Sequence, residues 1–528
     1  MNRVIIIGAG FAGLSASITL AEKGIPSHLI SLQPSERAQS VLAEGGINGA
    51  LNTMGEDDNT ENHFYDTMKG GVFLADPNAV DNLTKNAPDI LRWLEGLGVP
   101  FNKNNGNLVL RNFGGQKKKR TAYARSSTGK IMMSAVIDEA RKYESKGLIK
   151  RWSHHCFLHL LTENNICQGA RIQDVYTGEI ADFRGIVLLC TGGMNGIFPA
   201  MTTGTTQNSG DVTATVFSQG VLLGNLEMLQ YHPTTIGISG KRCLVTEAAR
   251  GEGGRLYIER NGGKWYFMEE KYPELKNLMP RDVVAREMYF VRREYGGWVY
   301  LDMTELPDDT WKNKLSDLRN EIIRYLAIDP KFKPIPVKEG IHYFMGGIDT
   351  NELHQTSMKN LYAAGECTCQ YHGANRLGGN SMLGALFGGR KSAETIMNHL
   401  QESEEMPVTF QKFDDDFTQE TSPDLILKIS QILLGALGIV RNESQLQDAL
   451  NQLQQLANER NYNIRERNRL QLAKGMLLSA LARKESRGAH YREDYPDKDE
   501  QFRKVTVCSC ENDTVNISFR ALPERRAN

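Results

Sequence analysis

The sequence predicts an α/β protein that contains a doubly wound, Rossmann-like domain with a parallel sheet. Residues 4–7 are a short apolar run, which is typical of a buried parallel strand. Residues 8–13 then read Gly-Ala-Gly-Phe-Ala-Gly, followed by a helical pattern that ends at Gly24 and a second strand at 27–31. In this strand, turn, helix, strand context, G-x-G-x-x-G indicates a dinucleotide site.

Each glycine of the first turn has a physical reason. Gly8 allows the tight turn, Gly10 lets the backbone approach a pyrophosphate, and Gly13 lets helix and strand pack closely. The acidic residue that usually holds a ribose after the second strand is absent, and Ser31 or Gln33 stands there instead. This weakens an NAD interpretation and is compatible with FAD, with Ser31 as a ribose partner; a glycine turn without a ligand is the alternative.

Two later apolar strands support the same interpretation. The runs at 186–190 and 360–364 end in Thr191-Gly192-Gly193 and in Gly365-Glu366. Ligands of open α/β sheets bind at such carboxyl ends of strands. A second G-x-G-x-x-G is absent from the middle of the sequence, so we expect no separate NAD(P) domain.

Composition excludes several classes of protein. The 528 residues are 40% hydrophobic and 24% charged, which indicates a folded globular chain. Lys+Arg total 62 against 63 for Asp+Glu, so the basic surplus expected of a nucleic-acid binder is missing, and we interpret the basic run at 117–120 as a solvated loop. The eight cysteines include no C-x-x-C, so we expect no iron–sulfur cluster, no metal site and reduced thiols.

The sequence shows neither a signal-peptide pattern nor a membrane-spanning stretch, and both points bear on where the protein is located in the cell. The start, Met1-Asn2-Arg3, runs directly into the first strand without the pattern of a signal peptide. The apolar stretch at 429–440 is shorter than the roughly 20 residues that a membrane span requires. We therefore expect a cytoplasmic chain that could dock onto a membrane partner.

Five short segments carry unusual polar chemistry. The segments carry His, Arg, Glu and Thr side chains, and the glycines beside His342 and Arg376 would admit a ligand to those two residues. Arg forks match carboxylates in bidentate geometry. If the segments converge, their two arginines and two histidines would suit a dianion. The segments are 231–235, 246–254, 280–282, 342–347 and 372–381.

With these motifs in this order, the chain resembles the flavoprotein subunit of the fumarate reductase/succinate dehydrogenase (complex II) family, which is related to L-aspartate oxidase. The resemblance runs from Val4 to about Pro496. It also rests on Ala-Glu-Gly-Gly at 43–46, on Phe-Gly-Gly at 113–115 followed by Arg120-Thr121, and on the run at 482–494.

The resemblance implies an FAD-dependent oxidoreductase of electron transport and anaerobic respiration that reduces fumarate to succinate or runs the reverse reaction. It implies that Arg281 donates the proton and that Glu247 and Arg250 resupply it. It implies that His232, His342 and Arg376 hold the two carboxylates, while Thr246 orients one of them. The FAD-binding residues that we expect are Gly8, Gly10, Gly13, Ser31, Gly45, Gly46, Gly193, Glu366, Ser381 and Leu383.

One departure from the family pattern concerns the cofactor bond. Many members carry a His just before the Ala-x-Gly-Gly run and link FAD through it, whereas this sequence has Gln39 there. Because an amide cannot form that linkage, we expect non-covalent FAD. A lower flavin potential, which favours fumarate reduction, would follow.

The resemblance also implies a domain order and partners. An FAD-binding domain at 1–224 and 343–397 would be split by a capping domain at 225–342. A helical domain at 398–496 and a tail with short strands at 497–528 would follow. The partners would be a separate iron–sulfur subunit together with a membrane-anchor subunit, placing the chain in the cytoplasm or peripherally on the inner face of the membrane.

Two alternatives stay open at this point. L-aspartate oxidase would share four of the site residues, but its Glu-Gly-Gly-His run is here Phe113-Gly114-Gly115-Gln116, and Ala489 also looks more like complex II. A flavin-binding tRNA-modification protein or an inactive scaffold is disfavoured by the balanced charge and by the presence of all five segments. The sequence leaves open the physiological direction, the electron partner, the particular unsaturated acid and the oligomeric state.

Overall fold

The computed structural model describes residues 4–125, 127–400, 408–412 and 414–526. The tripeptide Met1-Asn2-Arg3, used above in the argument about a signal peptide, lies outside the described residues. Among the helices that are described, none combines the length and apolarity needed to cross a bilayer.

The first domain is built on a five-stranded parallel sheet. Strand β1 lies at the switch point, because β2 and β8 follow it on one side while β12 and β21 follow on the other. This confirms the predicted α/β, doubly wound class. In order across the sheet the strands are β21 (Leu361–Ala363), β12 (Val187–Leu189), β1 (Val4–Ile7), β2 (Ser27–Ser31) and β8 (Ile149–Ser153).

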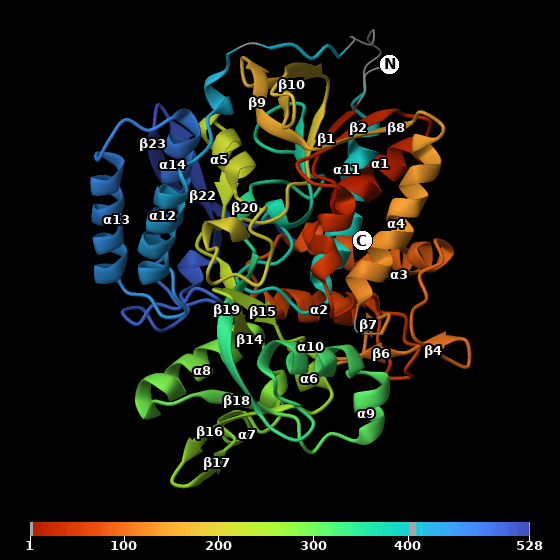
Figure 1. Ribbon diagram of the computed structural model, residues 1–528, viewed down its shortest axis with the longest axis vertical. Helices are drawn as coiled ribbons and strands as arrows, with labels where there is room; N and C mark the ends of the chain where they lie inside the picture. Colours follow the sequence, from red (N-terminus) through yellow and green to blue (C-terminus); the bar gives the residue numbers. More distant parts are fainter. Residues whose placement is uncertain (1–3, 126, 401–407, 413, 527–528) are drawn as a thin grey trace.

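Alternation along β1 explains how the sheet is covered. Val4 and Ile6 pack into a core shared with helices, whereas Ile5 and Ile7 face a second core shared with a three-stranded antiparallel sheet. Figure 1 shows this antiparallel sheet at the top and the helices on the right. The helices are α1 (Phe11–Glu22), α3 (Pro77–Gly96), α4 (Thr128–Glu144) and α11 (Asn380–Met397), and the antiparallel strands are β9 (His155–Glu163), β10 (Ile166–Asp174) and β11 (Ile180–Arg184).

A cap with its own core interrupts this domain. It is a six-stranded sheet with helix α8 (Arg281–Tyr295) packed on β14, at the bottom of Figure 1. Its long central strands β14 and β19 are antiparallel neighbours, so side chains from distant parts of the sequence meet there. The strands are β15 (Lys241–Leu244), β14 (Leu229–Ile238), β19 (Ile335–Phe344), β18 (Val299–Asp302), β16 (Arg255–Arg260) and β17 (Gly263–Trp265).

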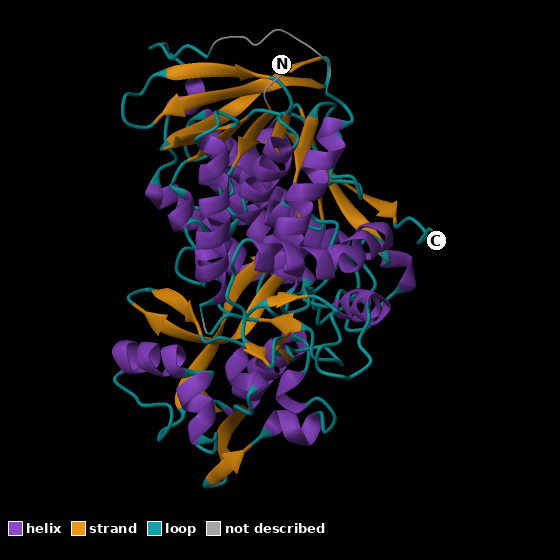
Figure 2. Cartoon of the chain, turned by 90° about the vertical axis from the view of Figure 1, so that its right-hand side faces the viewer, coloured by secondary structure: helices purple, strands orange, loops and turns teal. Residues whose placement is uncertain are grey.

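The C-terminal part adds three helices and a hairpin. The helices pack on one another on the left of Figure 1, and the hairpin joins a small sheet at the crossing into the cap. Figure 2 shows strands above a band of helices, with the cap below. These elements are α12 (Pro423–Ala436), α13 (Glu443–Ala457), α14 (Ile464–Ala482), β22 (Lys504–Glu511) and β23 (Thr514–Ala521), in the sheet order β20 (Gly347–Ile348), β13 (Leu223–Gly224), β22, β23.

Candidate active site

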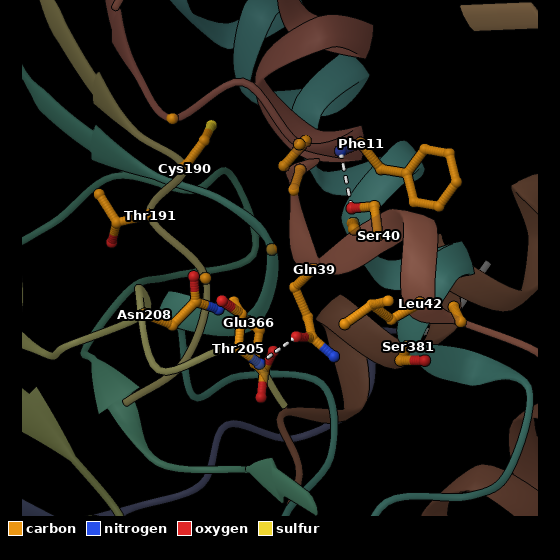
Figure 3. Close-up of a pocket in the computed structure, with 18 of the residues that line it drawn as sticks. Phe11, Gln39, Ser40, Leu42, Cys190, Thr191, Thr205, Asn208, Glu366 and Ser381 are labelled. Carbon is orange, nitrogen blue, oxygen red and sulfur yellow. Dashed lines mark hydrogen bonds between the residues drawn. The ribbon is translucent and has the colours of Figure 1, made fainter. Parts of the chain in front are cut away.

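One long cavity runs from the β1–α1 turn to charged side chains of the cap. Figure 3 shows lining side chains around Gln39. Both predicted sets of site residues contribute to its wall. The predicted residues that line it are Gly8, Gly10, Ser31, Gly45, Gly46, Glu366 and Ser381, together with His232, Thr246, Glu247, Arg281, His342 and Arg376.

Four predicted site residues lie behind this wall. Gly13 packs against the turn after β1, since an added Cβ would stand 1.9 Å from the Gly8 carbonyl oxygen. Gly193 backs onto the Glu366 carboxylate, and Leu383 is fully buried in the core. Arg250 lies behind Glu247 and reaches the cavity only through it.

The β1–α1 turn fits a dinucleotide. Gly8 has φ +112°, and a Cβ there would stand 2.1 Å from the Cys190 carbonyl oxygen, so only glycine is accommodated. Helix α1, whose N-cap is Gly10, has no acidic residue in its first turn, and its first N–H, that of Phe11, donates to the Ser40 Oγ at 3.2 Å. The positive end of the helix dipole, at residues that line the cavity, is therefore suited to a phosphate.

Two buried polar atoms at this end of the cavity also fit a cofactor. The Ser31 Oγ at the end of β2 and the Asn208 Nδ2 have no hydrogen-bond partner among the described residues, and both side chains line the cavity. Because buried polar groups are normally satisfied, these atoms indicate a hydrogen-bonding ligand. With the glycine turn, they make the cavity suitable for FAD.

At the other end, Glu247 joins two arginines. The Arg281 Nε and Nη2 donate to Glu247 Oε2 at 3.0 and 2.5 Å, and the Arg250 Nη2 donates to Oε1 at 3.2 Å. The Gly114 N–H donates to the same Oε1 at 3.2 Å. Arg281 is the first residue of α8, which positions its guanidinium at the cavity.

Electrostatics keep this carboxylate ionised. Burial alone would raise the pKa of Glu247, but the charges of Arg281 and Arg250 outweigh burial and lower that pKa to about 2. Glu247 therefore accepts hydrogen bonds at neutral pH, and an unbroken chain of contacts joins Arg250 to Arg281.

The two predicted histidines converge on the same place. His232 on β14 and His342 on β19 have ring centroids 5.1 Å apart. Burial, followed by the positive charge of Arg281, lowers both pKa values well below the ordinary imidazole value. The His232 Nε2 is buried without a partner in the described part of the chain, so both rings are neutral and one offers a free nitrogen.

Arg376 is a buried cation without a carboxylate partner. Its side chain lines the cavity, no ion pair joins it to a described residue, and its Nε is unsatisfied. The guanidinium lies over the Tyr343 ring at 4.3 Å from the centroid. Burial, with the neighbouring charge of Arg281, lowers its pKa to about 9, so the group is still protonated at neutral pH. An unpaired buried charge of this kind is strongly unfavourable until an anion joins it.

Glu366 differs from Glu247 because no arginine contacts it. Burial raises its pKa to about 7, opposed by hydrogen bonds from backbone N–H groups including that of Phe344 at 3.2 Å. Its carboxyl group lines the cavity on the side of the parallel sheet.

Several site residues were missed by the sequence analysis. Gln230 accepts from the Arg281 Nη1 at 3.1 Å, and Asn48 binds Asn380 at 2.7 Å under the site. Thr203 contacts the His342 Nδ1 at 2.7 Å. The sequence carried no signal for these three residues, because each contact joins positions that lie far apart along the chain.

The fold and cavity indicate a dinucleotide-binding protein. Beside its cap lies a pocket suited to an anion, formed by Arg281, Arg376, His232 and His342 and called the anion pocket below. The sequence profile described as "FAD binding domain" matches residues 3–382, and the one described as "Fumarate reductase flavoprotein C-term" matches residues 427–526.

Individual relatives agree with these two matches. The chain is 35% identical to the succinate dehydrogenase flavoprotein subunit of Bacillus subtilis over 96% of this chain and 93% of that protein. It is 31% identical to the fumarate reductase flavoprotein subunit of Helicobacter pylori, over 98% of this chain and 84% of that protein. The structure of E. coli quinol fumarate reductase FrdA superposes with a TM-score of 0.87 at 28% identity, covering 99% of this chain and 96% of that one. The chain therefore belongs to the succinate dehydrogenase/fumarate reductase flavoprotein family, a family of FAD-dependent oxidoreductases.

Proposed function

We propose that this chain interconverts fumarate and succinate, with Arg281 as the proton donor in the direction of reduction. The observation that carries the proposal is the cluster of Arg281, Arg376, His232 and His342 around one end of a cavity whose other end fits FAD. A small dianion would satisfy both the unpaired Arg376 and the free His232 nitrogen.

The cofactor supplies hydride exchange when it is bound. The glycine turn and the α1 N-terminus would hold its pyrophosphate, Ser31 its ribose, and Gly45, Gly46, Glu366 and Ser381 would lie along its length. FAD is the cofactor that the family profile supports, and residues of the parallel sheet and of the cap line the cavity that would hold it.

The side chains of this protein bind the substrate, orient it and supply a proton to it. Arg376, His232 and His342 hold the carboxylates, and Thr246, buried next to Glu247, orients one of them. The Arg281 guanidinium delivers the proton to an alkene carbon. Because Glu247 is ionised and contacts both arginines, it passes a proton from Arg250 to Arg281 once Arg281 has given its own to the alkene carbon. The cap excludes water from this step.

Arg281 is tested by a conservative substitution. We expect Arg281→Lys to lose at least about 10³-fold in kcat, since a single ammonium cannot keep two contacts to Glu247 while also meeting the substrate. The assay is anaerobic, fumarate-dependent oxidation of a reduced viologen dye by the purified chain. Arg293→Lys, at the exposed end of the same helix, is the matched control.

The outcomes separate the candidate functions. Full activity in Arg281→Lys would contradict the role of Arg281. Hydrogen peroxide formed from L-aspartate in air, without fumarate turnover, would move the protein to the oxidase. The buried Gln116 donates to Asn48 and to the Gly378 carbonyl, so it is occupied in the protein and offers nothing to a substrate amine.

FAD is proposed to be held without a covalent bond. The side chain at the linking position is Gln39, and its Oε1 accepts from the Thr205 N–H at 2.6 Å. Acid precipitation should release all the flavin into the supernatant, and the bound flavin should titrate at a potential below that of the fumarate/succinate couple. Flavin that stays with the protein pellet would contradict the first expectation, and a higher potential would contradict the second.

The proposed partners follow the same family. An iron–sulfur subunit, with a membrane anchor that holds the pair at the inner face of the membrane, would carry electrons to or from this chain. Among the described residues, no group of His, Cys, Asp and Glu is arranged to hold a metal ion, and in this proposal the iron–sulfur subunit carries electrons beyond the flavin. The domain boundaries at 224, 342 and 397 are part of this proposal.

A further inference from the structure

The long connection at 190–210, between β12 and α5 (Asp211–Ser218), includes a loop that reaches the anion pocket from the side of the parallel sheet. Thr203 in this loop is buried, and its Oγ1 lies 2.7 Å from the His342 Nδ1. No other side chain makes a hydrogen bond to the His342 ring within the described residues. The second nitrogen, Nε2, is therefore the atom left to meet a ligand in the cavity that His342 lines.

The proton on this ring decides what His342 can do. The ring is neutral because burial and Arg281 oppose its protonation, so it carries one N–H only. To donate to a carboxylate, Nε2 must hold that proton, and Nδ1 must then accept a hydrogen bond. A hydroxyl at 2.7 Å can supply it, whereas the other acceptor near the Thr203 hydroxyl, the Ile341 carbonyl oxygen, is at 3.5 Å.

The loop is fixed on both sides of Thr203. Before it, the Thr202 Oγ1 accepts from the Gly204 N–H at 2.9 Å, and the Thr203 N–H donates to the Ile341 carbonyl at 2.9 Å. After it, the Thr205 N–H donates to the Gln39 Oε1 at 2.6 Å, the dashed contact near the centre of Figure 3. Gln39, which also lines the cavity, therefore braces the loop.

We propose that Thr203 is a positioning residue that holds His342 in the Nε2–H form, so that a neutral ring donates to a substrate carboxylate, and that Gln39 holds Thr203 in place. This inference rests on the proposed function. It also gives Gln39 a role in the protein that does not depend on a covalent bond to the flavin. In this proposal Thr203 and Gln39 do not touch the substrate. They affect its binding only by positioning His342.

The test uses the FAD-loaded protein and a hydroxyl series at one position. Malonate, a dicarboxylate that cannot react, is titrated by the change in flavin absorbance. We expect Thr203→Val to weaken malonate binding about tenfold and to raise KM for fumarate similarly, with kcat changed by less than about threefold, because a ground-state contact is lost. Thr203→Ser keeps the hydroxyl and should bind malonate as the wild type does.

The bracing role of Gln39 is tested by a double-mutant cycle with Thr203. Gln39→Ala should weaken malonate binding in the same direction, and Gln39→Ala with Thr203→Val should be no weaker than Thr203→Val alone, since both act through His342. Full additivity would overturn the bracing role. Wild-type affinity in Thr203→Val, or equal weakening in Thr203→Ser, would overturn the role of Thr203.

A measurement without substrate keeps the inference separate from the proposed function. Imidazole nitrogen-15 shifts in histidine-labelled protein, assigned with His342→Gln, should show a protonated Nε2 in the wild type and a mixture of tautomers in Thr203→Val. A wild type that binds no dicarboxylate but shows this change would contradict the proposed function alone. An Nδ1-protonated ring in the wild type would contradict the inference.

Discussion

At the scale of residues, charge compensation at Glu247 governs the site. One buried carboxylate contacts Arg281 and Arg250, so its removal leaves two buried cations unpaired. We expect Glu247→Gln to cost about 3–5 kcal/mol in the free energy of unfolding, besides the loss of proton resupply and hence of fumarate turnover. Thermal unfolding of the FAD-loaded protein measures the first effect and the viologen assay the second.

The same residue predicts a pH dependence. The pKa of Glu247 falls from its ordinary 4.5 to about 2 on folding, so its ionisation stabilises the fold above pH 4.5, and that contribution is lost as the pH falls towards 2. The difference in melting temperature between wild type and Glu247→Gln should therefore shrink over this window. Glu259→Gln, at the exposed end of β16 in the cap, is the control, and a difference independent of pH would contradict the assignment.

Residue types were more predictable than residue contacts. Arg281, His232 and His342 stand out in the sequence because arginine and histidine beside glycine turns suit an anion. Thr203 does not, since its importance comes only from a contact across 139 positions of sequence. Gln230 was equally invisible, because an amide two residues before a notable His carries no signal of its own.

At the scale of elements, the β1–α1 turn is the most constrained feature. An alanine Cβ at position 8 would meet the Cys190 carbonyl oxygen at 2.1 Å, and the backbone there has φ +112°. Neither the strand nor the helix can move away without opening the parallel sheet. We expect Gly8→Ala to lower the free energy of unfolding by about 3 kcal/mol and to abolish FAD loading.

The control for this prediction is another glycine. Gly96, at the end of α3, has open space around its Cβ position and no positive φ, so Gly96→Ala should leave unfolding and flavin content unchanged. Flavin absorbance per chain after gel filtration and chemical unfolding provide the readouts. Normal FAD loading in Gly8→Ala would show that the turn tolerates a side chain.

The local elements of the first domain followed from the sequence because each is specified by neighbours in the chain. The strand at 4–7, the glycine turn and the helix that follows are where the pattern predicted them. The antiparallel layer on the second face of the parallel sheet could not be predicted from the sequence. Strands β9, β10 and β11 are recognisable as one layer only once they pack on Ile5 and Ile7.

At the scale of the whole molecule, the sequence could not show that the five polar segments meet at one cavity. The cavity draws its wall from residues between Ile7 and Arg465, and the cap supplies one end while the parallel sheet supplies the other. Composition and periodicity report single elements, so family resemblance was needed to place the five polar segments together. The structure then separated the residues that face the cavity from the four that stand behind it.

The C-terminal hairpin sets an order of events during synthesis. Strand β13, at Leu223–Gly224, pairs with β22, and β22 pairs with β23, which ends at Ala521. The Asn225 backbone next to this strand also bonds to Thr506. A ribosome must therefore synthesise nearly 300 residues after Gly224 before the small sheet at the crossing into the cap gains its last two strands, so this sheet is completed only at the end of synthesis.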